Sequence, residues 1–345
     1  MKAARFYEPG KIVVEEVETP QLLPDEVLIK VHYCGICGTD VHIFNGDEGS
    51  SKVSDKAILG HEFSGEIVKI GSDQNNYKNF KVGDLVCCDV NYSCGHCHYC
   101  NNGKPHLCDS MKGIGTAING AFAEYIAMPQ DKTFLIPEHL SLQEAAMTEP
   151  VSCCLHGIDL INISLGETVL IVGCGNIGLT MIQLCKYAGA SNIIAVEPIS
   201  HRRDLALQLG ADYVFDSNNA SVLSNVDLNQ TGPITKAIDC AGLISTAEFC
   251  IENAGKGATV LLFGLTGPHD VLSVKPFSMF LKELTIKTSF VNPFTFERAL
   301  NLLSNGIVKT SEIITDIYPL ADIQEVFANR LYAKNGKVLI KCVSE

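Results

Sequence analysis

Apolar and polar positions follow two different patterns along this chain, and the pattern changes near residue 150. Up to about residue 110 the apolar positions come in short runs separated by proline and glycine, namely KIVVEEV, EVLIKVHYC, GEIVKIG and KVGDLVCC. Short apolar runs bounded by turn residues are typical of β-strands. We therefore expect the first part of the chain to be β-rich and barrel-like.

After residue 150 the pattern alternates between strand, glycine-rich turn, helix and strand. The apolar run ETVLIVGCG precedes the helical pattern NIGLTMIQLCKYAGA, and a second apolar run, NIIAVE, follows. The alternation continues through RRDLALQLGA, YVFD, TKAIDCAG, STAEFCIENAG and ATVLLFG. Strands that alternate with helices predict a parallel, doubly wound sheet, and hence an α/β fold.

The last segment of the chain is not assigned by its pattern alone. The parallel sheet is expected to end near residue 285. Beyond it come the extended run LTIKTSF, the helical runs FERALNLLSNG and ADIQEVFANRLYAK, and a final strand, KVLIKC. These elements can complete either half of the chain.

Length and composition narrow the class of protein. A chain of 345 residues exceeds one ordinary hydrophobic core, so two domains are expected. The formal net charge of −13 argues against a nucleic-acid partner, because a polyanion requires clustered lysine and arginine. No apolar run is long enough to span a bilayer, and the N-terminal sequence lacks the order of a secretory signal. We therefore expect a cytoplasmic protein that binds small molecules.

The clearest chemical motif is a set of four closely spaced cysteines in the loop CGHCHYCNNGKPHLC. These are Cys94, Cys97, Cys100 and Cys108. Four thiolates so close together repel one another unless a cation neutralises them, and a tetrahedral zinc ion does so with a closed shell. We predict a structural zinc here, with a redox-active or incidental cluster as the alternative. The loop also contains His96, His98 and His106, any of which could replace one thiolate, but because the cysteine set is complete we expect these histidines to be solvated.

A glycine-rich turn follows the apolar strand TVLIV and opens a helical pattern. The turn contains Gly173, Gly175, Asn176, Ile177 and Gly178. This G-x-G-x-x-G spacing, with a strand before it and a helix after it, indicates a dinucleotide site whose pyrophosphate lies at the helix N-terminus. Glu197 ends the next strand, where a carboxylate accepts hydrogen bonds from the ribose of NAD and repels the 2′-phosphate of NADP. NAD is expected, although Arg202 and Arg203 follow closely and can also cradle a phosphate.

A second set of metal-binding residue types is scattered through the first half of the chain. Its members are Cys37, His61, Glu62 and Glu149. Mixed sulfur, nitrogen and oxygen ligands from separate segments suit a catalytic zinc, which keeps one position for water or substrate. By residue type alone, the same side chains also fit ordinary core and surface positions.

The context of these residues resembles the zinc-containing medium-chain dehydrogenases, and among them the sorbitol or polyol dehydrogenase group. The resemblance spans essentially the whole chain and is carried by CGICGTDVH, GHEFSGEIVKIG, VGDLV, the four-cysteine loop, GAFAEY, TEPVSCCLHG and VGCGNIGL. It implies a GroES-like catalytic domain formed by residues 1–150 and 286–345. It also implies a Rossmann NAD-binding domain formed by residues 151–285.

The resemblance also implies roles for the second set. Cys37 and His61 hold a catalytic zinc, so that the chain carries two zinc ions, and Glu62 is a direct or exchangeable ligand. Glu149 occupies the last ligand position, where alcohol dehydrogenases of the liver type have a cysteine and polyol dehydrogenases a glutamate. Thr39 and His42 are placed to relay the released proton to solvent through the cofactor ribose. Cofactor contacts are assigned to Arg202, Cys240, Phe263, Ser289 and Phe290.

The expected reaction is hydride transfer between NAD and the CH–OH group of a polyol or secondary alcohol. Sorbitol dehydrogenases of the animal type have an arginine and a tyrosine where this chain has Ser289 and Phe290, which argues against sorbitol itself. Other polar residues expected near the substrate are Thr116, Asn119 and Asn292. Alternatives are a threonine 3-dehydrogenase, a 2,3-butanediol dehydrogenase, a polyol-phosphate dehydrogenase, or a cofactor-binding protein without turnover.

The resemblance further implies a homodimer or homotetramer. In this family the Rossmann domains commonly pair their edge strands across a two-fold axis. The apolar strand ATVLLFG suits that role, because an uncovered apolar edge would favour aggregation.

Overall fold

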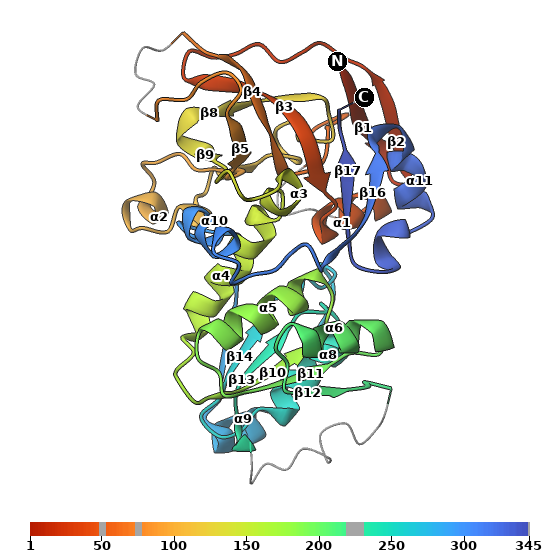
Figure 1. Ribbon diagram of the computed structural model, residues 1–345. Helices are drawn as coiled ribbons and strands as arrows, with labels where there is room; N and C mark the ends of the chain where they lie inside the picture. Colours follow the sequence, from red (N-terminus) through yellow and green to blue (C-terminus); the bar gives the residue numbers. More distant parts are fainter. Residues whose placement is uncertain (48–52, 73–77, 219–230, 344–345) are drawn as a thin grey trace. The chain divides into compact units, whose positions relative to one another are not determined.

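The computed structural model describes the chain except for residues 48–52, 73–77, 219–230 and 344–345 (Figure 1). The chain divides into two compact units. Unit 1 consists of Met1–Ser152, Pro293–Gly306 and Thr310–Glu345, and unit 2 of Cys153–Asn292 and Ile307–Lys309. Two units agree with the expectation from chain length.

Unit 1 is built on a seven-stranded sheet with the strand order β16-β17-β3-β4-β5-β9, in which β8 also pairs with β3. Its strands are β3 (Glu26–Gly35), β4 (Glu62–Ile70), β5 (Leu85–Cys88), β8 (Tyr125–Pro129), β9 (Thr133–Leu135), β16 (Ile314–Pro319) and β17 (Lys337–Lys341). Two two-stranded antiparallel sheets complete the β-structure, namely β1 (Lys2–Glu8) with β2 (Lys11–Glu16), and β6 (Asn91–Tyr92) with β7 (Lys112–Gly113). The expected β-rich, GroES-like half is confirmed.

The helices of unit 1 are short. They are α1 (Gly38–Asn45), α2 (His98–Asn101), α3 (Leu142–Ala145), α10 (Phe296–Ser304) and α11 (Ile323–Ala328), with 3-10 turns at η1 (Pro105–Leu107), η2 (Gln130–Lys132), η3 (Leu320–Asp322) and η4 (Leu331–Ala333). Helix α4 (Thr148–Ile161) begins in unit 1 and continues into unit 2. On α10 the buried residues Phe296, Ala299, Leu300 and Leu303 recur at helical spacing, so this helix buries one apolar face.

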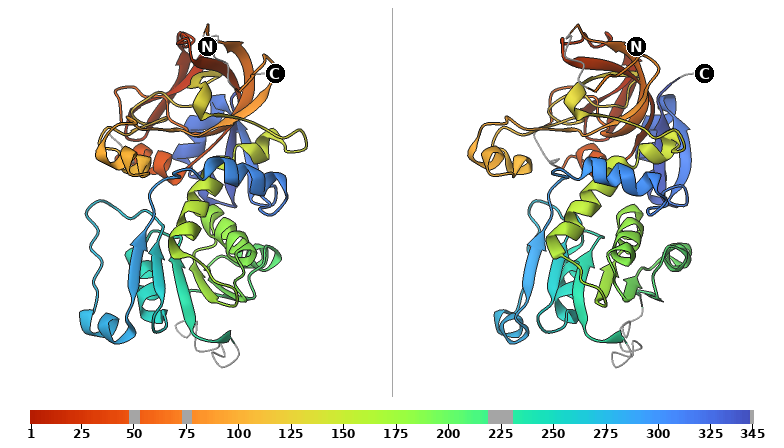
Figure 2. Two further views of the ribbon diagram at one scale, coloured as in Figure 1. Left: turned by 90° about the vertical axis from the view of Figure 1, so that its left-hand side faces the viewer. Right: turned by 60° about the vertical axis from the view of Figure 1, so that its left-hand side comes forward.

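Unit 2 is a six-stranded parallel sheet with the strand order β12-β11-β10-β13-β14-β15. Figure 2 draws its strands in green to blue. The strands are β10 (Thr168–Val172), β11 (Asn192–Val196), β12 (Tyr213–Phe215), β13 (Ile234–Asp239), β14 (Thr259–Leu262) and β15 (Thr285–Thr288). The helices between them are α5 (Asn176–Tyr187), α6 (Ser200–Gln208), α8 (Ile244–Asn253) and α9 (Pro276–Lys282). This strand order is that of the Rossmann fold. From β10 the chain first adds β11 and β12 on one side, and then adds β13, β14 and β15 on the other side. The predicted doubly wound sheet is confirmed.

The extended run LTIKTSF corrects two expectations. It forms β15, which pairs with β14 from Thr259↔Thr285 to Leu262↔Thr288. The boundary between the units therefore falls after Asn292, and not after residue 285. ATVLLFG contains β14, which lies between β13 and β15, so the expectation that it forms the sheet edge is wrong. An alternating run such as TIKT fits the edge of either sheet, and only strand pairing decides which.

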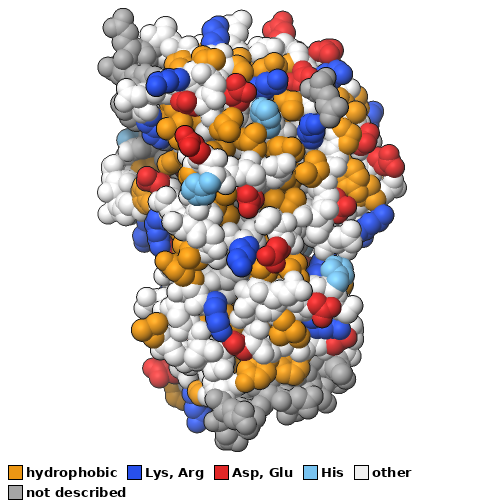
Figure 3. Space-filling view, viewed as in Figure 1, with side chains coloured by type: hydrophobic (Ala, Val, Ile, Leu, Met, Phe, Trp, Pro, Cys, Tyr) orange, Lys and Arg blue, Asp and Glu red, His pale blue; other side chains and the backbone are white. Residues whose placement is uncertain are grey.

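The surface carries charges of both signs. On the face that Figure 3 shows, Lys and Arg side chains are interspersed with Asp and Glu. Within the described residues, the helices are too short or too polar to cross a membrane.

Candidate functional site

Three residues from two segments of unit 1 converge on one point. These are Cys37, His61 and Glu62, and one potential ligand atom of each lies within 4.8 Å of the others. Cys37 is the N-cap residue of α1, whereas Glu62 is the first residue of β4. Gly35, at the end of β3, pairs with Glu62. The pairing of β3 with β4 therefore brings the two segments together.

Gly60 allows the backbone to turn immediately before His61. Its φ of 86° lies in the left-handed region, where side chains are rarely tolerated. A Cβ atom there would also lie 2.8 Å from the ring of Phe122 and from the Sγ of Cys34. Glycine is therefore required at this point for the histidine to face Cys37.

Asp40 links the two segments and was missed by the sequence analysis. Its side chain is fully buried. Oδ2 accepts a hydrogen bond from the backbone N–H of Cys37 at 2.9 Å, and Oδ1 accepts one from Gly60 at 3.1 Å. Oδ1 also lies 3.7 Å from Nδ1 of His61. A carboxylate in this position orients a metal-binding imidazole. The available signal was an acidic residue three positions after Cys37.

Lys337 is a second residue that the sequence analysis missed. It is the first residue of β17, with only 4 % of its side chain exposed, and it forms an ion pair with Oε2 of Glu62. Burial by itself lowers the pKa of Lys337, but the attraction of Glu62 and Cys37 outweighs it and leaves this pKa above its ordinary value. A cation therefore balances part of the negative charge at this site.

The electrostatics of His61 indicate what the mixed group of Cys37, His61 and Glu62 can bind. Burial lowers the pKa of His61, whereas Cys37, Asp40 and Glu149 raise it, and the net pKa lies well above its ordinary value. So much buried negative charge favours a cation at the centre of the group. A thiolate, an imidazole and a carboxylate are a donor set that zinc accepts, so these residues fit the predicted metal.

Glu149 is not part of that compact group. It lies in the first turn of α4, is 7 % exposed, and is close enough to raise the pKa of His61. Its predicted role as a fourth ligand stays a prediction.

The predicted proton relay lies on α1. Thr39 and His42 are three residues apart, so their side chains lie on the same face of the helix. Nδ1 of His42 is paired with Oδ2 of Asp47 at 3.0 Å. The side chain of His42 is partly exposed and has an acidic neighbour, an arrangement that allows proton transfer to solvent. The relay itself stays a prediction.

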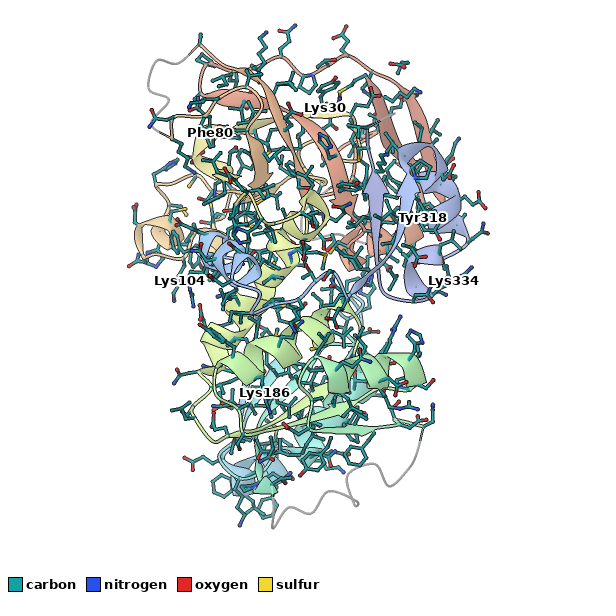
Figure 4. All side chains as sticks on the ribbon, viewed as in Figure 1. Lys30, Phe80, Lys104, Lys186, Tyr318 and Lys334 are labelled. Atoms are coloured by element: carbon teal, nitrogen blue, oxygen red, sulfur yellow. The ribbon has the colours of Figure 1, made fainter. Side chains whose placement is uncertain are left out.

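The four cysteines of the loop also converge. The Sγ atoms of Cys94, Cys97, Cys100 and Cys108 all lie within 4.8 Å of one another, and Lys104 marks this loop in Figure 4. The backbone N–H groups of Cys97 and Cys94 each donate to a sulfur at 3.3 Å, on Cys94 and Cys108 respectively. Such donors stabilise thiolates. None of the loop histidines joins this group within the described residues.

Two thiols of this loop have pKa values shifted in opposite directions. Hydrogen bonding, first of all from the backbone of Cys100, lowers the pKa of Cys97 to about 6. The backbone N–H of Cys94 lowers the pKa of Cys108, but burial and the neighbouring thiols raise it to about 11. Ionising one thiol thus opposes ionising another, which a zinc ion would relieve. The residues fit the predicted structural zinc.

The glycine-rich turn of unit 2 has the geometry that a dinucleotide site requires. Gly175 caps α5, and a Cβ atom added there would meet no atom within 4 Å, so the space beside it is open. A Cβ atom at Gly178 would collide with the carbonyl oxygen of Gly173. Asn176 Oδ1 is buried without a hydrogen-bond partner in the described part of the chain. The turn therefore offers room and an unpaired acceptor for a ligand.

Glu197 is held against this turn. Its Oε2 accepts a hydrogen bond from the backbone N–H of Cys174 at 2.7 Å, and its Oε1 accepts one from Ile199 at 3.0 Å. Arg203 donates to the carbonyl of Glu197 at 2.7 Å and forms an ion pair with Asp216 at 3.4 Å. A carboxylate is thus fixed at the end of β11, and Arg203 already has an acidic partner.

Four other residues predicted to contact the cofactor lie at the carboxyl ends of the strands of this sheet. Cys240, Phe263 and Ser289 follow the carboxyl ends of β13, β14 and β15, and Phe290 comes next. The glycine turn follows β10 at the same edge, where nucleotides bind in parallel α/β sheets. Ser289 Oγ is also buried without a partner in the described residues.

Two residues expected near the substrate also make structural contacts within unit 1. The Thr116 hydroxyl donates to the carbonyl of Gly113 at 3.1 Å, and Oδ1 of Asn119 accepts from the backbone N–H of Ile58 at 3.1 Å. Both residues therefore hold loops of unit 1 together. Asn292 is 2 % exposed.

Two family models match most of the chain. Residues 23–138 match the alcohol dehydrogenase GroES-like domain, and residues 176–305 match zinc-binding dehydrogenases. The first match includes Cys37, His61 and Glu62, and the second begins at the first residue of α5, the helix that follows the glycine turn.

Curated relatives of three substrate classes align over nearly the whole chain. D-arabitol-phosphate dehydrogenase from Enterococcus avium is 33% identical over 99% of this chain and 97% of its own length. Sorbitol dehydrogenase from Bacillus subtilis (strain 168) is 33% identical over 97% of this chain and 95% of its own. L-threonine 3-dehydrogenase from Caldanaerobacter subterraneus is 32% identical over 97% and 96%, respectively.

Solved structures of similar proteins contain either nicotinamide cofactor. A zinc-binding dehydrogenase from Sinorhizobium meliloti 1021, bound to NADP, has a TM-score of 0.92 and 35% identity and covers 99% of this chain and 98% of that one. An alcohol dehydrogenase from Escherichia coli CFT073, complexed with NADH, has a TM-score of 0.89 and 29% identity over 99% of both chains.

Proposed function

This chain belongs to the zinc-containing medium-chain alcohol dehydrogenase family and is a zinc-dependent dehydrogenase of CH–OH groups, and from that premise we propose that it oxidises a polyol or secondary alcohol with NAD. The observation that carries the proposal is the convergence of Cys37, His61 and Glu62, with Glu149 nearby in place of the cysteine of liver-type enzymes. The relatives that act on arabitol phosphate and sorbitol support the polyol class.

We assign the catalytic metal to Cys37, His61 and Glu62, with Glu149 completing the set. A zinc ion held there supplies a Lewis acid that lowers the pKa of the alcohol hydroxyl. Asp40 keeps the imidazole of His61 oriented through Nδ1. Thr39 and His42 then carry the released proton along one face of α1 toward solvent, where Asp47 orients the imidazole of His42.

We assign the nucleotide to the glycine turn, with NAD preferred over NADP. The support is the buried carboxylate of Glu197, which would repel a 2′-phosphate, and the pairing of Arg203 with Asp216. Because the similar proteins hold NADP in one case and NADH in another, the preference has to be measured. We expect KM for NAD to be at least about tenfold lower than for NADP, which corresponds to roughly 1.4 kcal/mol.

The substrate class is tested by a screen of alcohols at the nicotinamide absorbance, with polyols, vicinal diols, polyol phosphates and L-threonine as separate arms. We expect turnover of uncharged polyols or diols, with sorbitol not preferred, because Ser289 and Phe290 replace the arginine and tyrosine of the animal enzymes. A preference for threonine or for a polyol phosphate would assign the chain to those relatives instead. No turnover of any alcohol by protein with two zinc ions per chain would contradict the proposal.

We further propose that two copies of the chain associate through the edge of the sheet of unit 2. Strand β15 is the last strand of that sheet, and the preceding helix α9 exposes Phe277 and Phe280 by 73% and 77%. Exposed aromatic side chains beside an open strand edge indicate a covered surface in the assembled protein. The expected particle in light scattering is a dimer or tetramer, and Phe280→Glu should shift it toward monomer. A monomeric parent protein would contradict the assignment.

We place the protein in the cytoplasm, on the support of its cysteines. All fifteen are free thiols, and four of them form the predicted structural site. A reducing compartment keeps such thiolates available for zinc.

A further inference from the structure

Two neighbouring strands of unit 2 are each followed directly by an acidic residue. Glu197 follows β11 and Asp216 follows β12. The last residues of these strands, Val196 and Phe215, pair with each other, and the backbone N–H of Glu197 donates to the carbonyl of Phe215 at 3.0 Å. The two acids are therefore neighbours at the carboxyl ends of the strands. Glu197 is assigned to the ribose of the nucleotide, whereas Asp216 has no role in the reaction as described so far.

Asp216 is fixed by its own loop on one side and faces Arg203 on the other. Its Oδ1 accepts a hydrogen bond from the backbone N–H of Asn218 at 2.9 Å. Its Oδ2 lies 3.4 Å from Nη2 of Arg203. One carboxylate oxygen thus anchors the side chain, and the other is presented to the guanidinium group.

Arg203 is held through both of its terminal nitrogens. Nη1 donates to the backbone carbonyl of Glu197 at 2.7 Å, and Nη2 faces Asp216. The side chain of Arg203 is 19% exposed and that of Asp216 is 37% exposed, so water screens their attraction only in part. Arg203 also lies near the glycine turn. Burial raises the pKa of Cys174 in that turn, and the positive charges of Arg202 and Arg203 oppose the rise.

We propose that Asp216 is a positioning residue that keeps Arg203 paired and thereby unavailable to the 2′-phosphate of NADP. In sheets of this kind an acid after the second strand binds the ribose hydroxyls of NAD, and a nearby arginine can instead accommodate a 2′-phosphate. Arg203 is such an arginine, but NADP must compete with Asp216 for its guanidinium group, whereas NAD leaves the pair intact. This inference rests on the proposed function, since it concerns the same nucleotide site.

The test is a binding measurement on the Asp216→Asn variant. The amide keeps the size of the carboxylate and an acceptor for the N–H of Asn218, but it loses the charge that holds Arg203. We expect 2′-phospho-ADP-ribose to bind at least about fivefold more tightly than to wild type in titration calorimetry, because a released guanidinium group forms charge-assisted hydrogen bonds with phosphate. ADP-ribose, which lacks that phosphate, should keep its Kd within about twofold.

Asp212→Asn is the matched control for the loss of one negative charge. Asp212 lies at the opposite end of the same strand, directly before β12, and pairs with Lys186 at 2.9 Å. The substitution changes the net charge of the chain by the same amount as Asp216→Asn. It should leave the affinity for both ligands at wild-type values. An equal gain in affinity for 2′-phospho-ADP-ribose in this control would overturn the inference.

A double variant separates positioning of Arg203 from simple repulsion of the phosphate by Asp216. In an Arg203→Met background, Asp216→Asn should no longer raise the affinity for 2′-phospho-ADP-ribose, because the effect acts through the arginine. A gain that persists without Arg203 would overturn the positioning role, as would unchanged affinity in Asp216→Asn itself. Should Asp216→Asn not fold, Asp216→Ser also leaves an acceptor for the loop, and the same outcomes apply to it.

Failure of the inference is distinguishable from failure of the proposed function. A wild-type protein that oxidises no alcohol, or that prefers NADP, contradicts the proposed function. The change in affinity between wild type and Asp216→Asn still tests the role of Asp216, because the two ligands bind without turnover. A wild-type protein that oxidises alcohols with NAD, while Asp216→Asn binds 2′-phospho-ADP-ribose no more tightly, contradicts only the inference.

Discussion

The two candidate zinc sites of unit 1 are assembled in opposite ways. The loop site takes all four sulfur atoms from a single stretch, Cys94 to Cys108, with backbone N–H groups of the same stretch donating to the sulfurs. The mixed site takes its donors from Cys37 and the His61–Glu62 pair, and its charge is balanced by Lys337 near the C-terminus. A site made by one loop depends on local geometry, whereas the other depends on the pairing of distant strands.

The two sites also differ in what surrounds the donors. Four thiolates can close the shell of a zinc ion and leave no position for substrate. In the mixed site, a buried carboxylate, Asp40, lies 3.7 Å from Nδ1 of the histidine, and a buried ammonium, Lys337, contacts the glutamate. Such a shell is suited to a metal whose coordination changes during a reaction. We therefore expect that substitutions in the mixed site lower the rate of the reaction, and that substitutions in the four-cysteine loop lower the stability of the protein.

The largest expected effect is that of His61→Ala. Loss of the imidazole removes a central donor of the mixed site, so kcat/KM should fall by at least about a thousandfold, since a metal Lewis acid contributes several kcal/mol. Zinc content measured by mass spectrometry should fall from two ions per chain to one. Retention of two zinc ions together with normal turnover would remove His61 from the site.

Cys100→Ser should act on stability instead. The loop loses one thiolate and its zinc, and the melting temperature should fall by roughly 10 °C in calorimetry, given the several kcal/mol that a structural zinc contributes. Measured well below that temperature, kcat should remain within about threefold of wild type. A selective loss of kcat without loss of stability would contradict the division of roles.

Asp40→Asn should have an intermediate effect. The amide keeps the size of the carboxylate but loses the negative charge beside Nδ1 of His61, and changes of this kind cost about 10- to 100-fold in metal affinity or activity. Competition with a zinc chelator measures the affinity directly. Asp47→Asn, at the partner of His42, serves as the control for zinc affinity and should leave it unchanged. Equal zinc affinity in Asp40→Asn and wild type would show that Asp40 only supports the helix.

His98→Ala is expected to have the smallest effect. The residue lies inside the four-cysteine loop but is exposed, and it is not among the converging donors. Its removal should leave zinc content at two per chain and change the free energy of unfolding by no more than about 0.5 kcal/mol. Zinc loss in this variant would mean that a histidine replaces one of the thiolates.

The sequence predicted most of the fold and much of the candidate site. The two patterns of apolar positions predicted a β-rich first half and a parallel sheet in the second half, and the structure confirms both of these predictions. The strand order and the membership of β15 were not predictable, because TIKT has the pattern of an edge strand in either unit. Its pairing with β14 is a matter of backbone hydrogen bonds between distant segments.

What the sequence by itself determined are the features that are local. The four-cysteine spacing and the glycine turn are specified by a few consecutive residues, since thiolate repulsion and backbone clearance act over one loop. Only the tertiary structure identified Asp40 and Lys337, because a buried acid and a distant lysine have no meaning until strand pairing places them beside His61 and Glu62. Their roles come from low-dielectric electrostatics, which depends on distance in space and not along the chain.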